Sequence, residues 1–150
     1  MRKYIEIFLA LAFLAYGLIR VFAGTALLGQ EIGLVDFPAF QGPVVDISNF
    51  LDKANEKQLI PVSVAGYVSY IALMGLVLCT GAIRSLKNLP FGLSCIGAFI
   101  VMYVLLFVNF QTINPKVIHL AICFIMFIAL LWLKGSYRSM FKPGNRLESS

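Results

Sequence analysis

Charged and metal-binding side chains are scarce in this chain. Only 13% of its 150 residues are charged, and it holds one histidine and three cysteines. No acidic residue occurs from Lys57 to Leu147, so a proton path through a buried carboxylate is hard to build from one chain. The chain has no C-x-x-C, Walker loop, His-Glu-x-x-His or paired-carboxylate motif, which argues against dithiol oxidoreductases, nucleotide hydrolases and metalloproteases.

Long apolar sequence is abundant instead. Hydrophobic residues make up 60% of the chain, and four apolar stretches reach or approach the ~20 residues that a helix needs to cross ~30 Å of hydrocarbon. They cover residues 4–28, 60–83, 89–110 and 115–133. The last two joints are short, which favours antiparallel neighbours. We therefore predict an all-α membrane protein: one domain over residues 1–134, built as an antiparallel four-transmembrane-helix bundle.

The first apolar stretch also has features of a signal peptide. A basic start precedes it, and Val21-Phe22-Ala23 before Gly24 loosely fits a small-residue cleavage site. The apolar run is longer than the usual limit of about 15 residues, however, and Glu6 and Arg20 interrupt it. We therefore expect this stretch to be retained as the first membrane helix.

Basic residues are distributed unevenly across the predicted topology. Eight lie on the side of both termini and three on the other side: Arg2, Lys3, Arg84, Lys87, Lys134, Arg138, Lys142 and Arg146 against Lys53, Lys57 and Lys116. Because Lys and Arg concentrate in cytoplasmic loops, both termini are predicted to be cytoplasmic in a multi-pass protein of the bacterial inner (plasma) membrane. The basic tail, residues 135–150, is expected to lie against the anionic lipid bilayer, and the net charge of +5 requires no nucleic acid partner.

The segment between the first two stretches, residues 29–59, is the only extended region outside the predicted spans. Its first half, Phe37 to Pro43, contains proline and glycine and is expected to be extended or turned. In the second half, apolar residues fall at i, i+3, i+4 and i+7: Ile47, Phe50, Leu51 and Ala54. This spacing predicts a short amphipathic helix in the outer interface. The segment could cap the bundle or dock a protein partner, and the sequence leaves both open.

Small side chains recur along one stripe of the second stretch. The stripe consists of Ala65, Ser69, Ala72, Gly75, Cys79 and Ala82, and the first stretch offers Gly17 and Gly24. Such stripes let neighbouring helix backbones approach closely. We expect packing within the bundle, with a homo-oligomer formed through one of the stripes as the alternative.

Polar residues inside apolar spans are the functional candidates, because lipid would otherwise expel them. Arg20 lies inside a span that continues to Leu28, and Tyr16 precedes it by one turn on the same face. Further polar residues are expected at a similar outer depth on the other helices. We predict a ligand-binding site formed by Arg20, Tyr16, Tyr67, Asn109 and His119. Its ligand would be an anion or a quinone carbonyl. The structural interpretation pairs Arg20 with Glu31, Asp36 or a lipid phosphate.

Metal and catalytic chemistry have weaker signals. His119 and Cys123 stand at i and i+4 and could share a metal, but two ligands on one helix do not make a site. A histidine bonded to a neighbouring helix is the competing interpretation. We therefore assign no metal site and no catalytic residue, and we expect that the chain is not catalytic on its own.

One segment carries a family resemblance. Tyr16-Gly17-Leu18-Ile19-Arg20-Val21-Phe22-Ala23-Gly24 resembles the first helix of DoxX-like membrane proteins, which has Gly, a basic residue three on, then Phe and Gly. Phe50-Leu51, Ile60-Pro61, Gly75, Gly81 and Arg84 are similar to the pattern around that family's second helix. The chain departs from the family at Tyr16, where a His is common, and near Tyr70 to Ala72, where a Glu is common.

This resemblance covers most of the chain and implies a function. It implies an accessory subunit of a redox-linked membrane complex that binds a protein partner, a quinone or a lipid. Two alternatives come from other classes. One is a small-molecule transporter or channel formed by a homo-oligomer, and the other is a quinone-reducing subunit whose electron donor lies on another chain.

Overall fold

A computed structural model describes residues 2–111 and 115–134 of the protein. These residues form five helices and no β-strand: α1 (Arg2–Glu31), α2 (Pro38–Ala54), α3 (Val64–Leu86), α4 (Gly92–Phe110) and α5 (Lys116–Lys134). Four of the helices, α1, α3, α4 and α5, are long and apolar enough to cross a membrane. For the described residues, the prediction of an all-α fold with four apolar helices long enough to span a membrane is therefore confirmed. The predicted basic tail, residues 135–150, lies outside the described residues.

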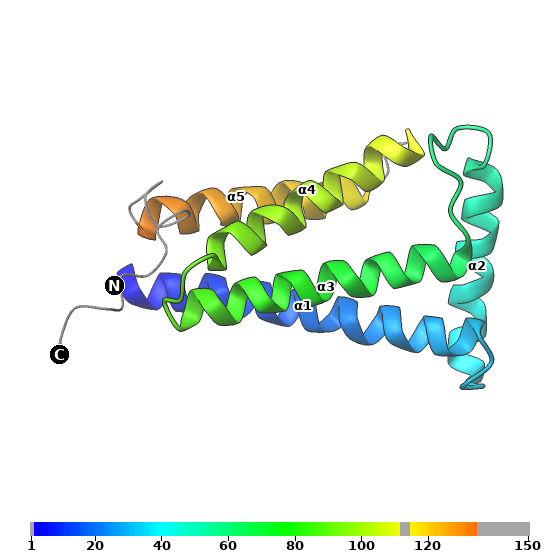
Figure 1. The fold of residues 1–150 in the computed structure, drawn as a ribbon, viewed down its shortest axis with the longest axis horizontal. Coiled ribbons are helices and arrows are strands. Elements are labelled where there is room, and N and C mark those ends of the chain that lie inside the picture. Colours follow the sequence, from blue (N-terminus) through cyan, green and yellow to red (C-terminus); the bar gives the residue numbers. More distant parts are fainter. Residues whose placement is uncertain (1, 112–114, 135–150) are drawn as a thin grey trace.

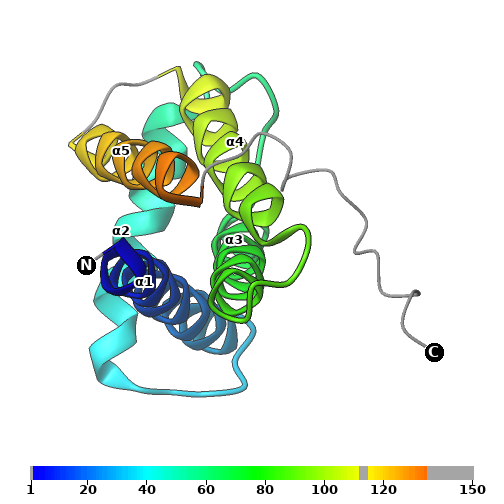
Figure 2. The ribbon, with the colours of Figure 1, turned by 90° about the vertical axis from the view of Figure 1, so that its left-hand side faces the viewer.

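The four long helices extend side by side, and α2 crosses one end of the group (Figure 1). Seen along the helices, the order around the group is α1, α3, α4, α5 (Figure 2). Each helix contacts its neighbours in this order, and α2 contacts α1 and α3. The sequence alone left this order undetermined, because the small-residue stripes do not say which helices they face.

Helix α3 begins four residues later than the predicted stretch. Ser63 is its N-cap, and the Ser63 hydroxyl accepts a hydrogen bond from the amide of Gly66 at 3.1 Å. Such a cap satisfies one of the amides that a helix start leaves without a backbone partner. Pro61 therefore precedes the helix.

Helix α2 corrects the expectation for the first half of the outer segment. The stretch from Pro38 to Pro43, expected to be extended or turned, forms the first turns of α2. Pro38 stands at the first helical positions, where its missing N–H costs nothing. Gln41 closes this end by donating a hydrogen bond to Asp36 at 3.0 Å. The proline and glycine residues that favoured a turn do not prevent the helix here. Pro43 removes only one backbone hydrogen bond, and other parts of α2 hold the helix in place.

The second half of α2 packs against the end of the group. Leu51 and Ala54 are buried and contact Tyr67 and Val68 of α3 and Phe110 of α4. Ile47 and Phe50, also at the predicted spacing, pack against the same cluster. The apolar positions of this segment therefore join α2 to the helix ends.

Helices α1 and α3 pack backbone against backbone and run in opposite directions. A methyl group on Gly75 would lie 2.8 Å from both the Gly17 carbonyl oxygen and the Val21 amide nitrogen. A methyl group on Gly24 would lie 2.8 Å from the amide nitrogen of Ala72. Ala72, Gly75, Cys79 and Ala82 of the predicted stripe are buried. Ser69 is exposed, so it lies outside this contact.

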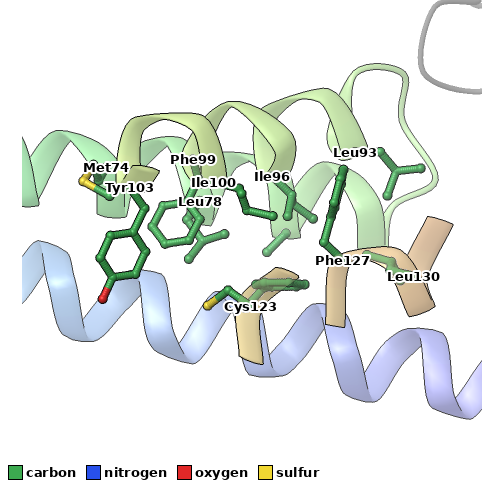
Figure 3. Close-up of a cluster of buried hydrophobic side chains, with 12 residues drawn as sticks. Met74, Leu78, Leu93, Ile96, Phe99, Ile100, Tyr103, Cys123, Phe127 and Leu130 are labelled. Carbon is green, nitrogen blue, oxygen red and sulfur yellow. The ribbon is translucent and has the colours of Figure 1, made fainter. Parts of the chain in front are cut away.

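Large apolar side chains fill the space between α3, α4 and α5, with Phe13 entering from α1 (Figure 3). Met74, Leu78, Ile96, Phe99 and Leu130 are fully buried in this cluster. Water exclusion contributes little between helices that are surrounded by lipid, so van der Waals packing and interhelical hydrogen bonds hold such a cluster together. Packing in this cluster determines which faces of α1 and α4 are turned toward each other at the site described next.

Candidate functional site

Arg20 points into the protein and is 9% exposed. Its Nη2 donates a hydrogen bond to the hydroxyl of Tyr16, one turn earlier, at 2.7 Å. The guanidinium carbon lies 4.8 Å from the ring centroid of Tyr16, 5.3 Å from that of Phe99 and 4.3 Å from that of Tyr103. A cation within about 6 Å of a ring face is attracted by the ring quadrupole. Three aromatic rings therefore hold the charge of Arg20 in an apolar surrounding.

The guanidinium is incompletely satisfied. Nε of Arg20 is buried and has no hydrogen-bond partner among the described residues. Nη1 makes a weak contact to the sulfur of Met74, at 4.0 Å. The predicted pairing with Glu31 or Asp36, both of them described residues, does not form, and Asp36 accepts hydrogen bonds from Gln30 and Gln41 instead. Burying a cation whose N–H donor is unused costs free energy, unless a hydrogen-bond acceptor reaches that donor.

A cavity of about 310 Å³ opens beside Arg20. Tyr16, Arg20, Tyr67 and His119 all line it, so the structure brings together four of the five residues that the sequence selected. Most of the remaining wall is apolar and comes from α1, α2, α3 and α4: Ala23, Gly24, Leu27, Ile47, Phe50, Val68, Ile71, Leu106, Phe107 and Phe110. The cavity is therefore amphipathic, with the Arg20–Tyr16 pair and a few further polar side chains in a mainly apolar wall.

Asn109 does not reach this cavity. Its side-chain oxygen accepts a hydrogen bond from the amide of Ile60 at 2.8 Å, and its side-chain nitrogen donates to the Ile60 carbonyl at 3.1 Å. The carbonyl of Asn109 also accepts from the amide of Leu59 at 3.0 Å. Asn109 thus ties the end of α4 to the segment before α3. The predicted depth of Asn109 therefore did not determine the direction in which its side chain points.

Three residues of the site were missed at the sequence level. Phe99 and Tyr103 are one turn apart on α4 and face Arg20. Inside an apolar span, aromatic residues at this spacing are typical of a helix core, so nothing distinguished them. Lys116 at the start of α5 also lines the cavity, and its charge had been considered only for topology.

His119 and Cys123 differ in their surroundings. His119 is exposed at the cavity rim, whereas Cys123 is buried in the core between α4 and α5. Among the described residues, no group of three or more His, Cys, Asp or Glu side chains could hold a metal ion. The structure therefore offers no third ligand, within the described ranges, to a metal shared by this pair.

The arrangement favours binding of an amphipathic molecule, with a polar group for Arg20 and an apolar body for the walls. Arg20 offers positive charge and an unused N–H donor, and a Tyr hydroxyl can donate or accept. The walls suit an apolar body, and few convergent polar groups in an apolar pocket are typical of small-molecule sites.

No family model, no curated protein and no solved structure matches this chain. The chemistry of the cavity therefore carries the functional interpretation.

Proposed function

We propose that this protein is an inner-membrane subunit of DoxX-like type that binds a quinone or a lipid in the cavity beside Arg20. The bound molecule would serve a redox-linked membrane complex in which this chain is an accessory component. The observation that carries the proposal is Arg20, whose side chain lines a mainly apolar cavity and whose buried Nε has no hydrogen-bond partner among the described residues.

The chemistry of the two ligand classes fits this observation. A quinone carbonyl or a lipid headgroup supplies the acceptor that Arg20 lacks, and charge-assisted hydrogen bonds of this kind are stronger than neutral ones. The apolar part of such a molecule matches the mainly apolar wall of the cavity, to which Leu27, Leu106 and Phe110 contribute. Because the protein and a quinone or lipid ligand would both lie in the membrane, the ligand enters the cavity without crossing water.

The proposed architecture is an antiparallel bundle of α1, α3, α4 and α5. In it, α2 is an amphipathic helix in the outer interface. The apolar residues of α2 that pack against Tyr67 and Phe110 support this placement, because the opposite face carries Asp46, Asp52 and Lys53. Helix α2 would then cover the outer end of the cavity.

The test is purification in a gentle detergent followed by mass spectrometry of retained small molecules. The wild type is expected to carry a quinone or lipid in near-stoichiometric amount, and adding that molecule back after delipidation should raise the unfolding temperature. An unrelated four-span membrane protein prepared in parallel controls for bulk lipid. Retention no greater than in this control, with no thermal stabilisation by quinone or lipid, would overturn the proposal.

The topology makes a separate prediction. In a background whose native cysteines are replaced by alanine, Glu56→Cys on the outer segment should react with an impermeant maleimide in intact spheroplasts. Lys87→Cys, on the α3–α4 joint, should react only after the membrane is permeabilised. Both positions are exposed, so access is set by the membrane and not by burial. Reaction of Lys87→Cys in intact spheroplasts would contradict cytoplasmic termini.

A further inference from the structure

A second, smaller cavity continues from the first. It has a volume of about 140 Å³ and lies between α1 and α5, lined by Ala12 and Phe13 on one side and Ile122 and Met126 on the other. Tyr16 and His119 line both cavities, so the two spaces adjoin at these two side chains, and Tyr16 is the residue whose hydroxyl accepts from Arg20. Ala12 lies eight residues before Arg20, about 12 Å along a helix. The smaller cavity thus extends from the polar site toward the middle of the membrane.

The charged side chains that line the two cavities are all basic. Arg20 and Lys116 are basic, and none of the described residues that line either cavity is acidic. A cation in an apolar medium is stabilised more by an anion than by a neutral carbonyl, because the anion also cancels the charge. The unused N–H of Arg20 gives such an anion a hydrogen bond in addition.

We infer that the ligand is a single-chain amphiphile with an anionic headgroup, a carboxylate or a phosphate. Its headgroup binds Arg20, and its chain runs along the cavity between α1 and α5. This inference rests on the proposed function and adds the charge of the head and the path of the tail. The apolar walls at Ala12, Ile122 and Met126 receive the chain.

The first experiment tests the headgroup. Delipidated protein in a neutral detergent is titrated with palmitate, palmitoyl lysophosphatidate, hexadecanol and a ubiquinone, and binding is measured by thermal stabilisation and by native mass spectrometry. We expect palmitate or lysophosphatidate to bind at least about tenfold more tightly than hexadecanol, as a charge-assisted bond requires. The carboxylate and phosphate arms identify the natural headgroup class.

The outcomes separate the two proposals. Equal binding of hexadecanol and palmitate overturns the inference, and so does binding of ubiquinone with no binding of either anion, but the second result leaves the proposed function standing. Binding of none of the four molecules overturns both.

The second experiment tests the path of the chain. Ala12→Phe fills the smaller cavity, whereas Ala15→Phe places the same ring on an exposed face of the same helix. With saturated carboxylates of increasing length, we expect wild type and Ala15→Phe to gain affinity up to long chains. Ala12→Phe should bind decanoate normally but lose at least about tenfold for palmitate, since each buried methylene contributes to affinity.

Binding of decanoate also shows that Ala12→Phe is folded, so loss of palmitate cannot be attributed to unfolding. If Ala12→Phe fails to bind decanoate, Met126→Phe fills the cavity from α5 and is scored in the same way. Identical chain-length profiles for the cavity-filling variant and Ala15→Phe would overturn the proposed path.

Discussion

Gly75→Leu is expected to prevent stable assembly of α1 against α3, and Gly75→Ala to destabilise the fold by about 1–3 kcal/mol. The reason is the lack of room: a methyl group at this position would lie 2.8 Å from both the Gly17 carbonyl oxygen and the Val21 amide nitrogen. Backbone atoms of a packed helix cannot rotate away as a flexible side chain can. The two helices must therefore separate, and the close packing on which membrane helices depend is lost.

The measurement is unfolding of the purified protein in mixed micelles, followed by circular dichroism as denaturing detergent is added. Gly97→Ala is the matched control, because a methyl group there meets the Phe127 ring at 3.4 Å, an ordinary contact distance. Gly97→Ala should be neutral or slightly stabilising, since alanine favours a helix over glycine. Equal stability of Gly75→Ala and Gly97→Ala would contradict the α1–α3 contact.

Arg20→Ala is expected to lower the affinity for the retained ligand at least about 100-fold while leaving the helices assembled. The substitution removes the charge and the spare donor of a residue that lines the larger cavity. Arg20→Lys should restore only part of the affinity, because an ammonium group cannot reproduce the planar guanidinium between the rings of Tyr16 and Tyr103. Ligand content by native mass spectrometry and binding by thermal stabilisation are the measurements.

Lys87→Ala serves as the control for charge alone. Lys87 is exposed on the α3–α4 joint and lines neither cavity, so its removal should leave ligand content unchanged. If Arg20 only anchored α1 to lipid phosphates, lysine would replace it fully and the retained ligand would not change. That result would remove Arg20 from the binding site.

The membrane spans could be predicted closely from the sequence, because length and hydropathy decide them. Helix ends were less accurate. Two interactions set the start of α3. One is the N-cap hydrogen bond of Ser63, which is local in the sequence. The other is the hydrogen bond between Asn109 and Ile60, which is a tertiary contact. For α2, the segment from Phe37 to Pro43 was predicted to be extended or turned, whereas the helix already begins at Pro38 and Gln41 donates a hydrogen bond to Asp36.

The candidate site was predictable in part. Arg20 and Tyr16 share a helix face one turn apart, so their proximity follows from helix geometry. Tyr67 and His119 were selected for depth alone, and the packing turned them toward the same cavity. Depth does not fix the direction in which a side chain points, which is why Asn109, chosen on the same ground, binds Ile60 instead.

The sequence by itself determined that the chain has four apolar helices long enough to cross a membrane and that an arginine within one of them needs partners, because both follow from the cost of placing polar groups in hydrocarbon. Tertiary structure alone decided what those partners are. Phe99 and Tyr103 reach Arg20 from α4 because the helix order α1, α3, α4, α5 and the close α1–α3 contact bring these helices together. Periodicity within one helix contains no information about the neighbour it will meet, so the aromatic surroundings of Arg20 and the two adjoining cavities exist only in the assembled fold.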